Sequence, residues 1–348
     1  TIFIYNGTTN QVTGNGLPAT ITSLTINNTG LAGNNTVNLT TTNTTTAVLN
    51  LTAGLFAAGA GQQLNISNGG TVNPVAGNFV TGATCGIINF LGSGSFTASC
   101  TPYDVYTSGG VNFGLTPIVV TIQNGGSFRI NTGGFASTNG PFYATGSTLI
   151  YNTGLAGYGI GVEWVNGVTS GRGVPHHVTI LASGTTILFG GALTPRTMTG
   201  NMTINSGTGL VLGTAIGGDL LIGGNWTRAA TGTFTNNARM VAFNGTTANQ
   251  TVTVTGGGME TFAFLTITKP DAFTFIMAAA PNATNITVNG NPASVAPVTT
   301  LLLSGNLELN QNTFNFTSWN GNQNHIRIDN VAGASTIRNI SSAGGQGV

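Results

Sequence analysis

The phrase NGTTNQV at residues 6–12 returns as NGTTANQTV at residues 244–252, about 240 residues later, and this duplication is the strongest indication of the fold class. Each copy follows a short apolar run, at residues 2–5 and 240–243. Each is also followed by a run of alternating polarity, at residues 23–26 and 264–267, and residues 49–55 are echoed at 301–307. A repeat of such long period is typical of stacked arrays, and we expect about one and a half copies of one super-repeat.

Short runs in which apolar and polar residues alternate recur along the whole chain. They place apolar side chains on one face of a strand and polar ones on the other. The runs end in Asn-Gly, Gly-Gly or Ser-Gly pairs, which tolerate the positive φ of tight corners, and helical periodicity is absent. The strand spacing fits a sandwich, a barrel or a solenoid. The repeated phrases favour an all-β parallel β-helix, or β-solenoid, with three short strands per coil of roughly 20–25 residues. Examples of the runs are residues 22–26, 64–67, 127–131, 201–205 and 306–310.

The predicted organisation is one continuous rod, a segment of a longer array. Solenoid repeats fill residues 1–140 and 176–348, and an irregular insertion or loop rich in aromatic and charged residues lies between them at 141–175. Outward-facing Thr and Asn are expected to form side-chain ladders between coils. Such ladders would keep a chain with few charges ordered.

Charge is scarce: only 4% of residues are charged, against roughly 25% in ordinary soluble domains, and the net charge is +1. The chain therefore has no basic field for nucleic acid and no acidic field for cations. The 40% apolar content still allows a large core. No run of about 20 apolar residues is present, so we expect no membrane insertion.

Cys85 and Cys100 are the only cysteines of the chain. We predict a disulfide across one hairpin or coil, which an extracellular protein can keep oxidised; the alternative is two buried thiols. Two cysteines without a nearby histidine do not complete a zinc site. We expect no metal and no cofactor.

No constellation for catalysis stands out. Glycoside hydrolysis needs two carboxylates across a groove, and the seven acidic residues are scattered. Glu163 and Arg172 form the nearest acid–base pair, and we expect Glu163 to support the irregular loop. His176 and His177, as neighbours in a strand, point to opposite faces and do not readily share a metal. We therefore expect a non-enzymatic protein.

Two sets of residues are candidates for binding. Tyr151, Tyr158 and Trp164 are predicted to form an exposed aromatic cluster that stacks on sugar rings. At the start of the chain, an apolar strand is a candidate for donation to a neighbouring molecule or for assembly. It consists of Ile2, Phe3, Ile4 and Tyr5.

Several phrases resemble a known class of repeats. They are GNMTINSG at 200–207, GGNWT at 223–227, GTFT at 232–235 and the stretch 241–252. Their order resembles the Thr/Asn/Gly-rich β-strand repeats of very large Bacteroidetes cell-surface proteins. Those proteins are exported by type IX secretion, and some are gliding-type adhesins. The resemblance implies extension, adhesion or assembly and carries over no catalytic residue. The family's C-terminal sorting domain is not visible at residues 341–348, so we expect a segment of a larger polypeptide.

From the repeats, the scarce charge and the resemblance we predict an extracellular, cell-surface structural or adhesive protein. Its partners would be other copies of itself or adjacent repeats, and surface polysaccharide. One alternative is a subunit that polymerises into a filament, end to end or by donating its first strand. The other is a carbohydrate-binding or carbohydrate-degrading solenoid.

Overall fold

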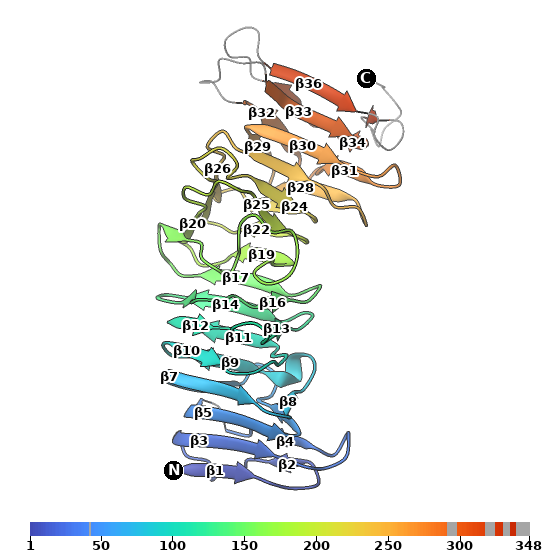
Figure 1. Ribbon diagram of the computed structural model, residues 1–348. Helices are drawn as coiled ribbons and strands as arrows, with labels where there is room; N and C mark the ends of the chain where they lie inside the picture. The colour runs from blue at the N-terminus through green and yellow to red at the C-terminus, as the bar shows by residue number, and fades with distance from the viewer. Residues whose placement is uncertain (42, 291–297, 317–323, 330–334, 339–348) are drawn as a thin grey trace. The chain divides into compact units, whose positions relative to one another are not determined.

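A computed structural model describes residues 1–41, 43–290, 298–316, 324–329 and 335–338 (Figure 1). It confirms the predicted all-β solenoid: strands pair in parallel, and the one helical segment in the described residues is a 3-10 turn at Ala83–Cys85. Contacts divide the chain into two compact units. Unit 1 comprises residues 1–153, 161–165 and 170–176, and unit 2 comprises residues 154–160, 166–169 and 177–348.

In unit 1, the first coils have one long sheet that later splits in two. β7 pairs with β9 through its first half and with β10 through its second half. The long sheet and its first branch contain β1 (Ile2–Tyr5), β3 (Thr20–Asn27), β5 (Thr44–Ala53), β7 (Gln63–Pro74), β9 (Ile87–Phe90), β11 (Asp104–Thr107), β14 (Ser127–Asn131) and β17 (Thr148–Asn152). The second branch contains β10 (Gly94–Phe96), β12 (Gly110–Asn112) and β15 (Phe135–Ala136). Two smaller sheets contain β2 (Gln11–Val12), β4 (Thr36–Asn38), β6 (Leu55–Ala57) and β8 (Asn78–Phe79), and β13 (Thr121–Ile122) and β16 (Phe142–Tyr143).

In unit 2, each coil has three strands. Val178, Met202 and Trp226 are register partners, so a coil there takes 24 residues, within the predicted range. The first face contains β19 (His177–Ile180), β22 (Met202–Ile204), β25 (Trp226–Ala229), β28 (Gln250–Thr255), β31 (Thr274–Met277), β34 (Asn306–Glu308) and β37 (Thr336–Arg338). The second contains β18 (Tyr158–Gly159), β20 (Thr186–Leu188), β23 (Gly209–Val211) and β26 (Thr233–Thr235), then β29 (Gly258–Phe262), β32 (Thr284–Val288) and β35 (Phe314–Phe316). The third contains β21 (Arg196–Met198), β24 (Leu220–Ile222), β27 (Met240–Phe243), β30 (Phe264–Thr268), β33 (Val298–Ser304) and β36 (Asn324–Asp329).

The core of each unit is made by the inward half of every alternating strand. Leu24, Leu49 and Val72 are register partners on β3, β5 and β7, and all are fully buried. Aromatic rings extend this stacking: the ring centroids of Phe96 and Phe113 lie 5.4 Å apart in unit 1. Burial of such columns, at about 25 cal/mol per Å² of apolar area, is the main force that holds one coil on the next.

The outward half of the strands forms the expected polar ladders. Thr25, Asn50 and Asn73 are register partners on three successive strands. The amide of Asn73 donates to Asn50 Oδ1 at 3.0 Å, and that of Asn50 donates to Thr25 Oγ1 at 3.3 Å. In unit 2, Asn201 N donates to His177 Nδ1, and Asn225 N donates to Asn201 Oδ1, both at 2.8 Å. These ladders therefore link coils through neutral polar groups.

The duplicated phrase occupies equivalent places in the two units. The strand before it pairs with the strand after it in both copies, β1 with β3 and β27 with β30. Tyr5 is in register with Ile26, and Phe243 with Ile267. The echo of residues 49–55 at 301–307 also occupies equivalent places, because β3 pairs with β5 and β30 pairs with β33. The repeat in sequence is thus a repeat in structure.

The irregular stretch begins later than predicted. Within residues 141–152, β16 and β17 still pair in parallel with the preceding coil, and the side chains of β17 alternate inward and outward. Residues 153–176 are the irregular part and hold one short strand, β18, in this fully described stretch.

Candidate functional site

The predicted aromatic cluster is not exposed. Tyr151 and Trp164 are fully buried, and Tyr158 is 7% exposed. Tyr151 lies on β17 in register with the inward Ile130, and Tyr158 is in register with the inward Ile187 in the other unit. Alternation therefore turns both tyrosines into the core. Stacking on a sugar needs an open ring face, so the three rings do not form the predicted glycan contact.

Glu163 has the predicted supporting role in the irregular stretch of unit 1. Its side chain is buried, and its Oε1 accepts a hydrogen bond from Gly161 N at 2.9 Å. Its backbone carbonyl accepts from the Tyr143 hydroxyl at 3.0 Å. Arg172 does not face Glu163 among these contacts; its guanidinium donates to Gly140 O at 2.7 Å and lies 4.9 Å from the centre of the Phe142 ring. The Tyr151 hydroxyl on β17 lies 3.5 Å from Glu163 Oε1 as its donor, so Glu163 and Arg172 both fasten the irregular stretch to regular coils.

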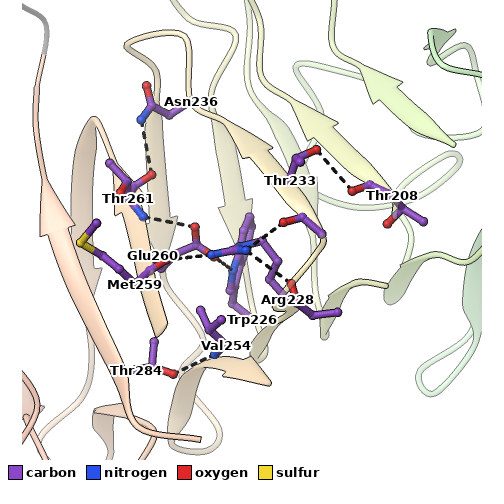
Figure 2. Close-up of polar contacts among 12 residues, drawn as sticks. Thr208, Trp226, Arg228, Thr233, Asn236, Val254, Met259, Glu260, Thr261 and Thr284 are labelled. Carbon is purple, nitrogen blue, oxygen red and sulfur yellow. Dashed lines mark hydrogen bonds and ion pairs between the residues drawn. The ribbon is translucent and has the colours of Figure 1, made fainter. Parts of the chain in front are cut away.

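Unit 2 contains a buried charged cluster that the sequence did not reveal (Figure 2). The carboxylate of Glu260, on β29, accepts hydrogen bonds from Trp226 Nε1 and Arg228 Nε, both at 2.8 Å. Arg228 also donates to Met259 O and Gly232 O, each at 2.8 Å. Burial raises the pKa of Glu260, although the Arg228 guanidinium and the hydrogen bonds it receives oppose that rise. Every strong donor of the cluster is already satisfied by the protein, so the cluster joins β25 to β29.

The corner made by the repeated phrase is closed by one side chain from the next coil. In unit 2, Lys269 Nζ donates to Gly245 O, to Ala248 O at 2.8 Å and to Gln250 Oε1 at 3.0 Å. Lys269 is 1% exposed, and this burial lowers its pKa to about 8. Gln250 in turn donates to Ile222 O at 2.9 Å in the preceding coil.

The first copy builds the same corner with a neutral residue. Asn28 stands two residues after Ile26, as Lys269 stands two after Ile267. Its amide donates to Thr9 O at 2.6 Å and lies 3.5 Å from Gln11 Oε1. Beneath each closing residue lies a glycine with positive φ, Gly54 at 78° and Gly305 at 107°, whose added Cβ would strike Asn28 or Lys269. We name this arrangement the corner lock, defined by Gln11 and Asn28 in unit 1 and by Gln250 and Lys269 in unit 2.

The structure holds Cys85 and Cys100 as two free, buried thiols, and not as the predicted disulfide. Cys85 Sγ accepts a hydrogen bond from Tyr103 N at 3.4 Å. Burial raises the pKa of the Cys85 thiol to about 12 and also raises that of the Cys100 thiol. Thiols that stay protonated in an apolar interior behave as small core side chains.

The first strand is already part of a sheet. Residues Ile2 to Tyr5 form β1 and pair in parallel with Ser23 to Ile26 of β3. Phe3 and Tyr5 face inward and are half-buried, whereas Ile2 and Ile4 are 68% and 58% exposed. Donation of this strand to a neighbour would first have to break the β1–β3 pairing, so the geometry does not favour that mode of assembly.

Among the described residues, no group of three or more His, Cys, Asp or Glu is placed to hold a metal ion. Within the same ranges, no helix is long and apolar enough to cross a membrane. His177 accepts a hydrogen bond from the next coil, as described above, and so serves a ladder.

Among the described residues, each unit has an open groove lined by polar side chains. The groove in unit 2 has a volume of about 300 Å³ and runs over β21, β24 and the repeated phrase. We name it the Thr groove. It is defined by Thr197, Thr199, Leu221, Asn244, Thr246 and Thr247. The groove in unit 1, of about 390 Å³, is lined by Thr81, Thr101, Thr121, Gln123 and their neighbours.

The two grooves share a chemistry but differ in how many polar groups are free. Neither has a charged side chain in its lining. In unit 1, Gln123 donates to Val80 O at 2.9 Å and accepts from Gly82 N at 2.8 Å, so its amide is committed to joining coils. Hydroxyl and amide groups without a charge recognise ligands by hydrogen bonding alone. The Thr groove is therefore the stronger candidate binding site.

Comparison of the sequence and structure with known protein families, curated proteins and solved structures finds no match.

Proposed function

We propose that this chain is a non-enzymatic structural segment of a long extracellular fibre or adhesin. The observation that carries the proposal is the corner lock, which recurs in two units with the same strand pairings on either side. An extended array can be built by repeating the same type of coil at a long period. Such an array can grow in length because each coil contacts only its neighbours.

The outward faces support the same role. Coils are joined by neutral ladders such as Thr25–Asn50–Asn73, whose strength depends little on salt. The apolar columns beneath them add further coils without a limit on core size. Both properties suit a protein that extends from a cell into a medium of variable ionic strength.

A first experiment tests location. Antibody raised against the full chain should label intact cells that produce it, and brief protease treatment of those cells should remove the label while a cytoplasmic marker survives. Labelling that appears only after lysis would overturn the extracellular assignment.

A second experiment tests adhesion. Beads that carry the full chain should resist detachment by flow from glass and from polysaccharide-coated surfaces better than beads that carry albumin at equal density. Equal detachment on all surfaces would leave extension as the role and remove adhesion. Sedimentation of the pure chain over a wide concentration range separates the filament alternative, since a self-polymerising subunit would grow in mass with concentration.

A further inference from the structure

The Thr groove combines free hydrogen-bonding groups with a small apolar floor. Asn244, Thr246 and Thr247 are exposed and come from the repeated phrase. Within the described residues their side chains form no hydrogen bond to the protein, unlike Lys269 and Gln250 just beneath them. Exposed groups of this kind hydrogen-bond to solvent, and a ligand with complementary hydroxyls can replace that solvent at little cost.

The floor of the groove is apolar and closely built. Leu221 is the half-buried outward residue of β24, and Met198 of β21 is 1% exposed. Gly223 continues the floor, where an added Cβ would lie only 2.4 Å from Thr199 O. The absence of a side chain at Gly223 thus lets the backbones of two coils approach closely at the floor of the groove. Threonine methyl groups add further apolar surface to the walls.

The charge of the lining selects among ligands. No Lys, Arg, Asp or Glu lines the groove, so it offers neither a counter-charge for phosphate, sulfate or carboxylate nor a ligand set for a cation. A ligand that buries hydroxyls against threonine and asparagine, and CH groups against leucine, has the surface of a neutral sugar. The volume of about 300 Å³ lies at the small end of ligand sites, which fits one or two sugar rings.

We propose that the Thr groove binds a neutral saccharide. The inference deepens the proposed adhesive function by naming its ligand class, and it rests on that function only for its biological setting. Since no aromatic ring lines the groove, a single site should be weak, with a dissociation constant on the order of 1 mM. Many copies along a fibre would raise the effective affinity through multivalency.

The test uses the full chain and saturation-transfer NMR, with uncharged hexose oligosaccharides as the probe and oligogalacturonate as their charged counterpart. The neutral oligomers should bind at about millimolar concentration, and the charged one more weakly. The double variant Thr246→Val and Thr247→Val removes two hydroxyls while keeping side-chain shape, and should weaken binding roughly tenfold. Leu221→Trp should fill the groove and abolish binding.

The matched control is Thr203→Val with Thr227→Val, two half-buried outward threonines on β22 and β25 that do not line the groove. It should bind as the parent does. Far-ultraviolet circular dichroism checks that all variants fold, and the valine pair still decides the matter if Leu221→Trp does not fold. The inference is overturned if no neutral oligomer binds, or if the control weakens binding as much as the groove variants. If cells are labelled and beads adhere but sugars do not bind, this inference alone fails.

Discussion

Replacing Arg228 by Met should expose how unit 2 depends on its buried charged cluster. Glu260 is 2% exposed, so without Arg228 its carboxylate stays in the core with only Trp226 Nε1 and Thr261 N as donors. Removing one partner of a buried ion pair costs about 3–5 kcal/mol. The substitution also removes the bonds from Arg228 to Gly232 O and Met259 O.

Hydrogen exchange followed by mass spectrometry measures this cost where it arises. At pH 7, peptides covering β25 and β29 should exchange faster by roughly two to four powers of ten, since each factor of ten corresponds to about 1.4 kcal/mol. Peptides covering β9 and β11 in unit 1 should not change, because each coil depends only on its own contacts and those with its neighbours. A change of less than about threefold in β25 and β29 would show that the Arg228–Glu260 pair contributes little to the local stability.

The same cluster should respond to pH in a definite direction. Because burial raises the folded pKa of Glu260 above its ordinary value of 4.5, the folded state binds the proton more tightly than the unfolded state. Stability of β25 and β29 should therefore rise as the pH falls from neutral towards 4.5, and more steeply in Arg228→Met. Glu260→Gln, already neutral, should cost less than Arg228→Met and should abolish the pH dependence; an equal or larger cost would contradict this account.

Three further outcomes follow from the corner lock and the thiols. Lys269→Met should destabilise β28 and β30 by about 2–4 kcal/mol, as measured by hydrogen exchange, because Gly245 O and Gln250 Oε1 lose their charged donor. Lys269→Asn copies the closing residue of the first repeat and should cost less than half as much. Because the folded pKa of Lys269 is about 8 against 10.5 when unfolded, the folded state binds fewer protons between these values, so exchange-derived stability should rise from pH 8 to pH 10.5 and stay flat over that range in Lys269→Met. Cys85 and Cys100 should resist iodoacetamide at pH 8 in the native protein, and both should react in denaturant without a reductant; one intact disulfide by mass would contradict the structure.

The solenoid was predictable because the two features that produce it can be recognised in short stretches of sequence. Alternation fixes which side chain enters the core, and glycine-containing corners fix where a strand ends. The ladders follow from the same pattern, since parallel stacking brings outward residues such as Asn50 and Asn73 side by side. The alternation of apolar and polar residues along each strand is therefore enough to specify both the core and the ladders.

The candidate site was predictable only in part, for reasons that individual residues show. Alternation through Thr148, Leu149, Ile150 and Tyr151 already puts Tyr151 on the inward face with Leu149, a signal that outweighs its amphipathic character. Arg228 likewise shares the inward face of Trp226, but its partner Glu260 comes 32 positions later and from a different strand face. The Thr groove depends on four separate segments meeting, at residues 169, 197–199, 221–223 and 244–247, and no local pattern records this.

The corner lock has a consequence for how such chains diverge. The position that closes the loop holds an amide in one copy and an ammonium in the other, yet the glutamine and the positive-φ glycine around it keep their places. The same backbone corner thus accepts different closing side chains. Repeats can then differ from one another in charge and stability at the closing position, while the backbone of the corner keeps the same strand register in each of them.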